Sequence, residues 1–431
     1  MKKIKRAIAV MLAMLMTIQL IACGNSTETK DEGTEENKIT VCLPRNEMDS
    51  TGYIEGKTRE FEEQTGIEVE LINTSWDNTA DLVTKEMSVG GSTYDVVELD
   101  NSWVEKFVTN GWVEPLNEYE GCNEIMEGLL PGLVNTFSDT DGNFYGVTWN
   151  NDTRFFMYNA QMLEEAGISV PPKTWNELVE DCKILKDKGI CEYGLIMSHQ
   201  GLASVNELTY TIYSFGGEIF DAEGNMVVQE DQKSVEALQF AADILADGTV
   251  NPTAISCEYE AAANVFYAGE AAFYLQAYPS MYATSNDESV SSIVGQAEVA
   301  PYTITNSEDT NVCLTLPEAM AIPSASKNKE AAWEYIKFMA SEDTNKEQAK
   351  EIGTLPIYSS LYSDPELLEL YPYWENVGKQ SEFSRALPCL EEYSVYADIF
   401  LTETQNMLMG SVTAQQAADN TYQQFAEATG E

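Results

Sequence analysis

The sequence predicts an α/β protein built from two domains. The first observation is an alternation of strand and helix patterns that begins at Lys38 and continues to Gly111. The second is the length of 431 residues, which is more than one ordinary hydrophobic core accommodates. The third is the composition, because 44% hydrophobic and 10% aromatic residues are typical of a folded globular protein.

The alternation starts with three strand patterns, rich in apolar and β-branched residues, at 38–43, 67–72 and 94–99. Helical patterns lie between and after them, in the residues before Gly66, at 81–88 and at 103–108. This order predicts a sheet with helices on both faces. Ligands of such sheets bind outside the carboxyl ends of the strands, where the loop containing Glu47 and the side chain of Asp100 are expected.

Residues 141–160 contain two short strand patterns, 145–148 and 155–158, that enclose six residues with polar or aromatic side chains. These six are Trp149, Asn150, Asn151, Asp152, Thr153 and Arg154. Buried polar groups cost free energy unless they are paired. The sequence therefore predicts either an internal polar network or a polar ligand at this position.

The rest of the chain continues the α/β pattern. Further helices are predicted at 161–166, from the capping box Thr174–Glu177 to Gly189, and at 209–215, 234–246, 329–339, 398–409 and 413–428. Further strands are predicted at 271–276 and 319–323.

The N-terminus has the layout of an export signal, with four basic residues followed by an apolar run at 7–21. The sequence Leu-Ile-Ala-Cys at 20–23 resembles the lipobox of bacterial lipoproteins, which implies that residues 1–22 are a signal peptide and that Cys23 is lipidated. Residues 24–37 contain no apolar side chain, so residues 23–37 are expected to form a disordered tether.

Charge and residue types exclude several classes of protein. The formal net charge of −47 argues against nucleic acid and anionic lipid as partners. The chain has one histidine, His199, and no CxxC or HExxH, so neither a zinc or copper site nor any cofactor is expected. The seven cysteines after Cys23 are expected to be buried free thiols, with a pairing of Cys182 and Cys191 left open.

No catalytic motif is present, but polar residues stand beside aromatic residues at predicted element ends. Carboxylates and arginine bind hydroxyl groups, and aromatic rings match the C–H face of a sugar ring. This combination suits an uncharged, polyhydroxylated ligand. The structural alternative is packing, which is expected for Trp103 and Trp333 and is as plausible as ligand contact for the cluster Tyr371, Tyr373 and Trp374.

Eight segments in order resemble the extracellular solute-binding proteins of ABC importers that take up maltose, trehalose and other sugars. They are 61–69 (FEEQTGIEV), 95–116, 144–167, 171–178 (PPKTWNEL), 215–220 (FGGEIF), 269–273 (GEAAF), 321–338 and 383–394. The resemblance implies a two-lobed, type II periplasmic-binding-protein-like fold, with a ligand cleft between α/β lobes that close by a hinge. It places the N-lobe at 38–149 and 302–341 and the C-lobe at 150–301 and 342–431.

The resemblance also implies the function and the site. It implies a monomeric, non-enzymatic lipoprotein that is anchored through Cys23, with a palmitate-type acyl chain, to the extracellular face of the membrane of a Gram-positive bacterium. This lipoprotein would deliver a carbohydrate, expected to be an oligosaccharide, to an ABC permease. The positions that match sugar contacts are Glu47, Asp100, Asp152, Tyr278 and Arg385. The family's Gly-Gly-Trp is absent before residue 319, so Trp149, Trp374 or Tyr53 is expected to supply the stacking ring.

Three other functions stay open at this point. They are a binding protein for a non-sugar solute, a secreted glycoside hydrolase, and a sensor or adhesin built on the same fold. A hydrolase would need two carboxylates with separated pKa values at a fixed distance, which a sequence does not reveal.

Overall fold

A computed structural model describes residues 37–46, 48–49, 51–221, 224–307 and 310–430. The predicted signal peptide, the lipidation site Cys23, nearly all of the tether and the candidate ligand contact Glu47 lie outside the described residues.

The first sheet has five strands in the order β2-β1-β3-β10-β4. Their bounds are Glu68–Thr74, Lys38–Pro44, Val96–Asp100, Glu318–Ala321 and Val147–Asn150. The first three are parallel, as the alternating strand and helix pattern predicts, and β10 is antiparallel to β3 and β4. The carboxyl ends of the parallel strands therefore meet at one edge, where the first connecting loop and Asp100 lie.

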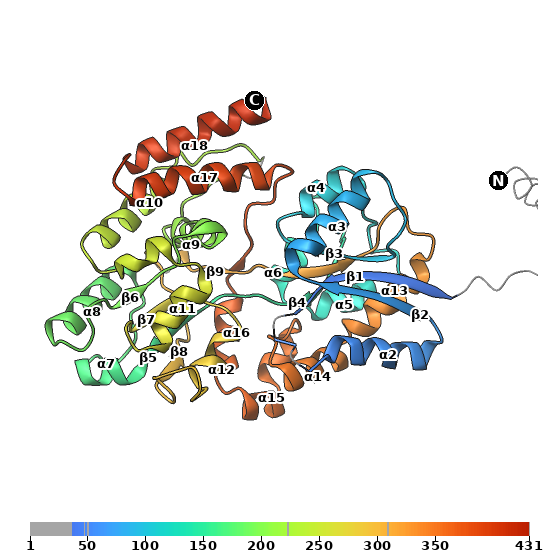
Figure 1. Cartoon of the computed structure of the whole chain (residues 1–431), viewed down its shortest axis with the longest axis horizontal. Coiled ribbons are helices and arrows are strands. Elements are labelled where there is room, and N and C mark those ends of the chain that lie inside the picture. The colour runs from blue at the N-terminus through green and yellow to red at the C-terminus, as the bar shows by residue number, and fades with distance from the viewer. Residues whose placement is uncertain (1–36, 47, 50, 222–223, 308–309, 431) are drawn as a thin grey trace, which may run out of the picture. The chain divides into compact units, whose positions relative to one another are not determined.

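Helices cover both faces of this sheet. On one side lie α2 (Tyr53–Thr65) and α13 (Lys329–Met339), and on the other lie α3 (Trp76–Ser88) and α4 (Val104–Thr109) (Figure 1). Two short helices, α5 (Cys122–Gly128) and α6 (Pro131–Thr136), complete this part. The predicted helix at 81–88 begins earlier than expected, because Ser75 caps it by accepting a hydrogen bond from the Asn78 backbone.

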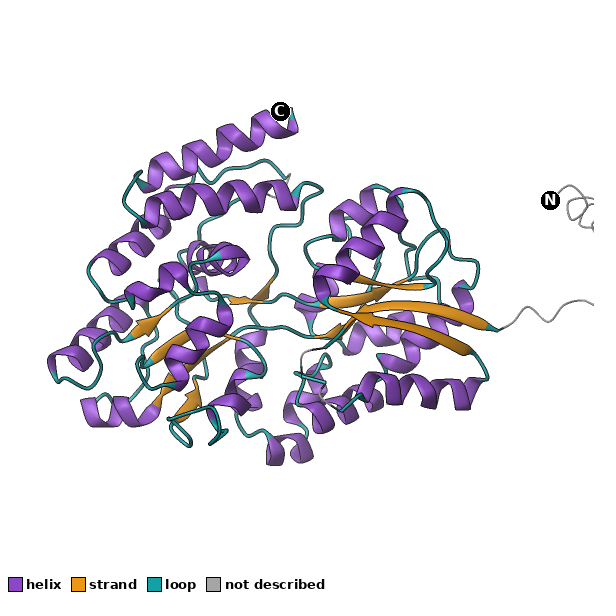
Figure 2. Cartoon of the chain, viewed as in Figure 1, coloured by secondary structure: helices purple, strands orange, loops and turns teal. Residues whose placement is uncertain are grey.

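The second sheet has four strands in the order β6-β7-β5-β8. Their bounds are Leu195–Ile196, Phe273–Ala277, Phe155–Asn159 and Ala297–Val299. The helices of this part are α7 (Ala160–Ala166), α8 (Trp175–Asp187), α9 (Gly201–Ser214), α10 (Gln232–Ala246), the 3-10 helix η1 (Pro252–Ser256), α11 (Tyr259–Tyr267), α12 (Met281–Ser285), α16 (Trp374–Ser381), α17 (Tyr393–Leu408) and α18 (Ala414–Thr429). Figure 2 shows strands inside and helices outside in both parts. The predicted capping box of Thr174 and Glu177 is confirmed at the start of α8.

The chain passes between the two sheets more than once. It leaves the first sheet after β4 and enters the second at β5, and it returns between β8 and β10. On the way back β9 (Cys313–Leu314) pairs with β11 (Ser384–Arg385), a segment that follows α16. Extended segments far apart in the sequence therefore run side by side between the two sheets.

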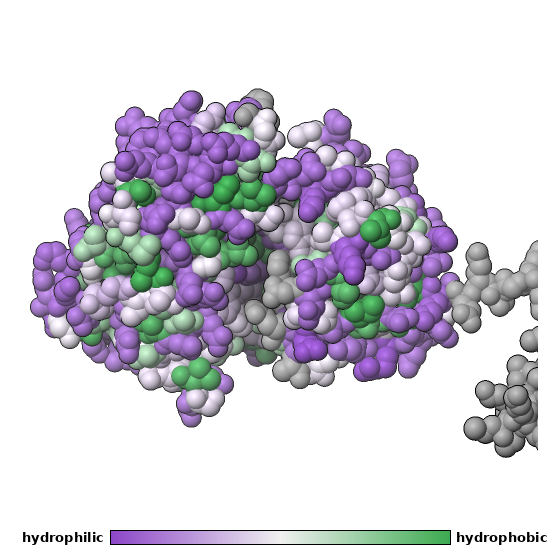
Figure 3. Space-filling view, turned by 45° about the horizontal axis from the view of Figure 1, so that its top comes forward, coloured by the Kyte–Doolittle hydropathy of each residue, from purple (hydrophilic) through white to green (hydrophobic). Residues whose placement is uncertain are grey.

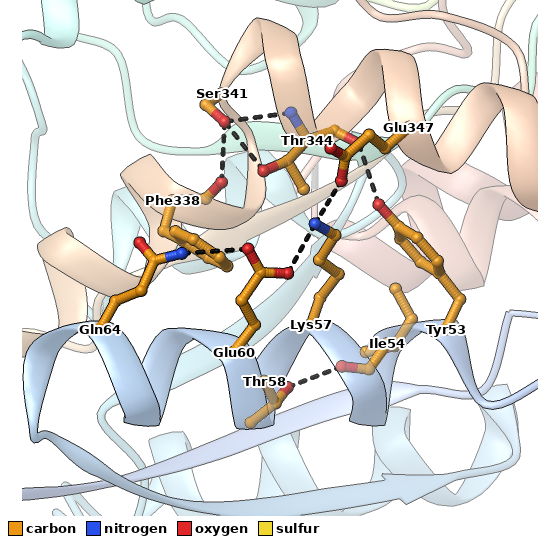
Figure 4. Close-up of polar contacts among 10 residues, drawn as sticks. All are labelled: Tyr53, Ile54, Lys57, Thr58, Glu60, Gln64, Phe338, Ser341, Thr344 and Glu347. Atoms are coloured by element: carbon orange, nitrogen blue, oxygen red, sulfur yellow. Dashed lines mark hydrogen bonds and ion pairs between the residues drawn. The ribbon is translucent and has the colours of Figure 1, made fainter.

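Helix α14 (Glu342–Ile352) is attached to α2 of the first sheet (Figure 4). Lys57 bonds to Glu347, and the Tyr53 hydroxyl donates to the Thr344 carbonyl at 3.0 Å. The predicted boundary after residue 341 assigns α14 to the other lobe, whereas these contacts tie it to the first. The helix is followed by the 3-10 helix η3 (Ser359–Ser363) and α15 (Pro365–Leu370). The lobe boundaries themselves stay a prediction.

Most expectations about packing are confirmed. Trp333 is buried and Trp103 packs against the core. The seven described cysteines are free thiols, Cys182 and Cys191 included, but Cys389 is exposed, so the expectation that all seven are buried is wrong for that residue. Among the described residues, no helix combines the length and apolar character needed to cross a membrane.

Candidate functional site

A cavity of about 660 Å³ lies between the loop after β1, the segment after β4 and helix α11. Figure 3 shows the molecular surface hollowed between the halves that contain the two sheets. Its lining is polar and aromatic: Pro44, Arg45, Asn46, Met48, Asn150, Asp152, Arg154, Tyr259, Glu260, Asn264, Tyr267, Tyr278, Pro279, Ser280, Thr284, Val290 and Glu318. Two of the predicted contacts, Asp152 and Tyr278, are brought together there.

The segment between β4 and β5 is extended, so its side chains alternate between two sides. Asn150, Asp152 and Arg154 line the cavity. The intervening residues bond to the protein: the Trp149 indole donates to Glu98 at 2.9 Å, and the Asn151 amide donates to the Pro356 carbonyl at 2.8 Å. The sequence left open whether this segment is a polar network or a ligand site. The structure directs one set of its residues to bonds within the protein and the other set to the cavity, and ligand contact stays a prediction.

Arg154 and Asp152 form a largely buried ion pair in the cavity wall. Nη2 of Arg154 donates to Oδ2 of Asp152 at 2.6 Å, and the guanidinium lies over the Tyr259 ring, 4.3 Å from its centroid. Nε and Nη1 of Arg154 and Oδ1 of Asp152 have no hydrogen-bond partner among the described residues. Unpaired charged donors and an unpaired charged acceptor are thus buried together in the cavity wall.

Burial and charge act in opposite directions on this pair. Burial raises the pKa of Asp152 above its ordinary value, although Arg154 lowers it in part. Burial by itself lowers the pKa of Arg154, but Asp152 and the neighbouring tyrosines raise it above its ordinary value. Each charge therefore depends on the other, and the pair as a whole is neutral.

Tyrosine rings lie beside the ion pair in the cavity lining. Tyr259 and Tyr278 meet edge to face, with centroids 6.3 Å apart, and Tyr267 lies on the same helix as Tyr259. The sequence predicted Tyr278 but missed helix α11. The signal was present, because Glu260, Asn264 and Tyr267 stand at the i, i+4 and i+7 positions of one helix face.

The other predicted contacts lie elsewhere. Asp100 is 6% exposed and accepts hydrogen bonds from the Ser102 backbone and hydroxyl at 2.8 and 2.5 Å. Trp149 is buried, and Trp374 has no exposed surface and stacks on Tyr371, with centroids 4.2 Å apart. None of these residues lines the cavity, and the structure places Trp374 in the core. Their assignment as ligand contacts stays a prediction.

Arg385 lies at a separate cavity with Tyr213. Its guanidinium bonds to both carboxylate oxygens of Glu218, through Nη1 at 3.1 Å and through Nη2, and lies 3.5 Å from the centroid of the Tyr213 ring. Two of its five N–H donors are thus engaged with Glu218. Ligand contact by Arg385 also stays a prediction.

A further buried carboxyl group, that of Glu207, is influenced by the charge of Arg154. Glu207 of α9 is 1% exposed, and its Oε1 accepts from the Ser198 backbone at 3.3 Å, whereas Oε2 has no partner among the described residues. Burial raises the pKa of Glu207 to about 8, and the Ser198 bond and the charge of Arg154 lower it only in part. Glu207 is therefore largely protonated at neutral pH.

Comparison with known proteins connects this site to one family. A family model described as bacterial extracellular solute-binding protein matches residues 47–346. A protein of Brucella abortus (strain 2308) described as a binding protein is 26% identical over 345 residues, which cover 76% of this chain and 82% of that protein. A protein of Deinococcus radiodurans described as a probable ABC transporter-binding protein is 25% identical, covering 80% of this chain and 83% of its own.

Solved structures give the fold. T. maritima MalE3 with maltose bound superposes with a TM-score of 0.77 at 25% identity, covering 91% of this chain and 99% of that chain. The sugar-binding protein MalE of Xanthomonas citri gives 0.78 at 21% identity, covering 90% and 96%. These likenesses confirm the predicted two-lobed α/β fold of the MalE type. The relatives are binding proteins.

Proposed function

Because the chain belongs to the family of bacterial extracellular solute-binding proteins, we propose that it captures a carbohydrate in the cavity between its sheets and delivers it to an ABC transporter permease. It acts as a binding protein without catalysis of its own. Its partners are the sugar and the permease, and it works as a monomer. The lobe boundaries predicted above are part of the proposal, with α14 moved to the first lobe.

The Arg154–Asp152 pair is the observation that carries this proposal. A hydroxyl group accepts one hydrogen bond and donates another, so a ligand hydroxyl that reaches the pair satisfies the unpaired donors of Arg154 and the unpaired Oδ1 of Asp152 together. A carboxylate or phosphate ligand would add a negative charge to a pair that is already neutral, beside Glu260 and Glu318. The wall therefore favours an uncharged polyol.

The tyrosines support the same class of ligand. Tyr259 and Tyr278 present ring surface next to the hydrogen-bonding groups, as recognition of a sugar ring requires. MalE3, the relative with 25% identity, has maltose bound. We assign Asp152, Arg154, Tyr259 and Tyr278 as ligand contacts.

The proposal predicts that one class of carbohydrate raises the melting temperature of the purified protein in a panel of sugars, polyols, peptides and anions. A ligand that binds only the folded state stabilises that state by mass action. The Tyr278→Leu variant should bind this ligand about tenfold more weakly, which corresponds to ~1.4 kcal/mol. Thermal shift identifies the ligand and titration calorimetry gives the affinities.

Tyr422→Leu is the matched control, because Tyr422 is exposed on α18 and does not line the cavity. It should bind as the wild type does. A shift with peptides or anions but with no carbohydrate would contradict the proposal, as would equal affinities of the two variants.

We also propose that the protein is a lipoprotein, held by acylated Cys23 on the extracellular face of the cell membrane. This proposal is supported by the lipobox-like sequence and by residues 24–37, which contain no apolar side chain. The Cys23→Ala variant should move from the membrane fraction to the culture medium or the soluble fraction, as fractionation and immunoblotting would measure. A Cys389→Ala variant, which alters an exposed thiol elsewhere, should stay with the membrane. Retention of the Cys23→Ala protein in membranes would contradict the anchor.

A further inference from the structure

Three carboxylates meet at the edge of the first sheet. Glu98 and Asp100 are alternate residues of β3, and Glu318 stands opposite Asp100 on the antiparallel strand β10. One oxygen from each lies within 4.8 Å of the others. Both strands are buried sheet strands, so the backbone holds the three side chains together.

The surroundings do not neutralise Glu98. Its side chain has no exposed surface, its Oε2 accepts from the Trp149 indole, and its Oε1 has no partner among the described residues. The charged groups that act on it are Glu318 and Asp100, both negative. Buried like charges at this separation repel strongly, so the cluster requires protons or a cation.

Asn101 supplies an observation that is independent of the carboxylates. The residue is 6% exposed, and its amide nitrogen donates to Oδ1 of Asp100 at 3.5 Å. Its Oδ1 has no partner among the described residues. The structure places the amide nitrogen toward Asp100, and a bound cation would favour the half-turn of the amide that exchanges the two atoms and brings the oxygen to the cluster.

From these observations we propose that Glu98, Asp100, Glu318 and Asn101 form a binding site for one hard divalent cation, with Ca²⁺ as the preferred ion. All four side chains offer oxygen, the ligand atom that Ca²⁺ and Mg²⁺ select. Ca²⁺ takes oxygen ligands at about 2.3–2.6 Å, so two ligands on opposite sides of the ion stand roughly 4.6–5.2 Å apart. The mutual limit of 4.8 Å allows one ion to contact all three carboxylates.

The ion has a route to this site and a place for its remaining ligands. Glu318 lines the main cavity, and Asn150, also in the lining, donates to its Oε2 at 2.8 Å. Asn46 in turn donates to Oδ1 of Asn150 at 3.3 Å. Water or ligand hydroxyls in the cavity can therefore complete the coordination of the ion on the Glu318 side.

Calorimetry on the purified protein tests the site after EDTA treatment and removal of the chelator. With CaCl₂ we expect one ion bound per chain, a rise in melting temperature, and weaker effects with MgCl₂. Glu98→Gln should weaken Ca²⁺ binding at least about tenfold, because it removes one charged ligand. Glu334→Gln, which alters an exposed carboxylate paired with Lys337, is the matched control and should bind Ca²⁺ as the wild type does.

The melting temperature in EDTA gives a second readout, which does not depend on losing a carboxylate ligand of the cation. In EDTA the Glu98→Gln protein should melt at a higher temperature than the wild type, because the amide is neutral without taking up a proton. With saturating Ca²⁺ the order should reverse. Should Glu98→Gln not fold, Glu318→Gln serves in its place. The proposal is overturned if none of Ca²⁺, Mg²⁺ and Mn²⁺ gives heat or a melting shift, or if the Glu98→Gln protein binds Ca²⁺ as tightly as the wild type.

Discussion

Replacing Arg154 by methionine will lower the free energy of unfolding by about 3 kcal/mol at pH 7. Removing one partner of a buried ion pair costs roughly 3–5 kcal/mol, because the other charge stays buried without compensation. We expect the lower end of this cost, because the Asp152 side chain is 23% exposed and water reaches part of it. The loss also includes the contact of the guanidinium with the Tyr259 ring.

Urea denaturation of the wild type, Arg154→Met and the double variant Asp152→Asn/Arg154→Met measures this effect. The double variant should recover most of the loss, because it leaves no unpaired charge. The defect of Arg154→Met should shrink as the pH falls. Its folded state, which lacks the arginine, holds the Asp152 proton more tightly than the wild type does, so acid favours that state. A loss that is equal in the single and double variants would contradict this account.

The sequence predicted the elements that depend on local pattern. The strands of the parallel alternation and the capped helix α8 have strong periodicity, and tertiary contacts only adjust their ends. Two-residue strands such as β9 and β11 have no period to detect, because they exist only through their pairing with each other. The start of α14 did carry a signal, because Ser341 caps the helix by accepting a hydrogen bond from the Thr344 backbone. Its contacts with Tyr53 and Lys57 of α2 could not be predicted, because they join residues far apart in the sequence.

The candidate site was predicted in part for the same reason. Asp152 could be found because it stands in a polar segment between two strand patterns. Period-two alternation also separates Trp149 from the cavity side, and applying it to this segment would have removed Trp149 from the candidates. Trp374 could not be judged from the sequence, because an aromatic residue looks alike in a core and in a binding site. Its burial follows from stacking on Tyr371.

Glu207 should make the free energy of unfolding fall as the pH rises. In the unfolded chain a glutamate releases its proton near 4.5, whereas burial holds the pKa of folded Glu207 at about 8. The folded state therefore binds the extra proton between these values. The stability that this proton contributes is fully present below pH 4.5 and is lost as the pH rises through 8. Between pH 6.5 and 8 the loss from this one group is about 2 kcal/mol.

Between pH 6.5 and 8 the effect of Glu207 on stability can be measured without a contribution from its neighbour His199. Burial lowers the pKa of His199 from 6.5 to about 4, so His199 removes stability only as the pH falls below 6.5. Burial also raises the pKa of Glu98, so Glu98 likewise lowers the free energy of unfolding as the pH rises. The contribution of Glu207 must therefore be measured by comparison with a variant.

Between pH 6.5 and 8 the free energy of unfolding of Glu207→Gln should fall by about 2 kcal/mol less than that of the wild type, as denaturation at each pH would show. Glu334→Gln, which alters an exposed carboxylate far from this site in the sequence, should keep the full slope. Equal slopes in Glu207→Gln and the wild type would mean that Glu207 is ionised in the folded protein, and that the charge of Arg154 is shared between two carboxylates.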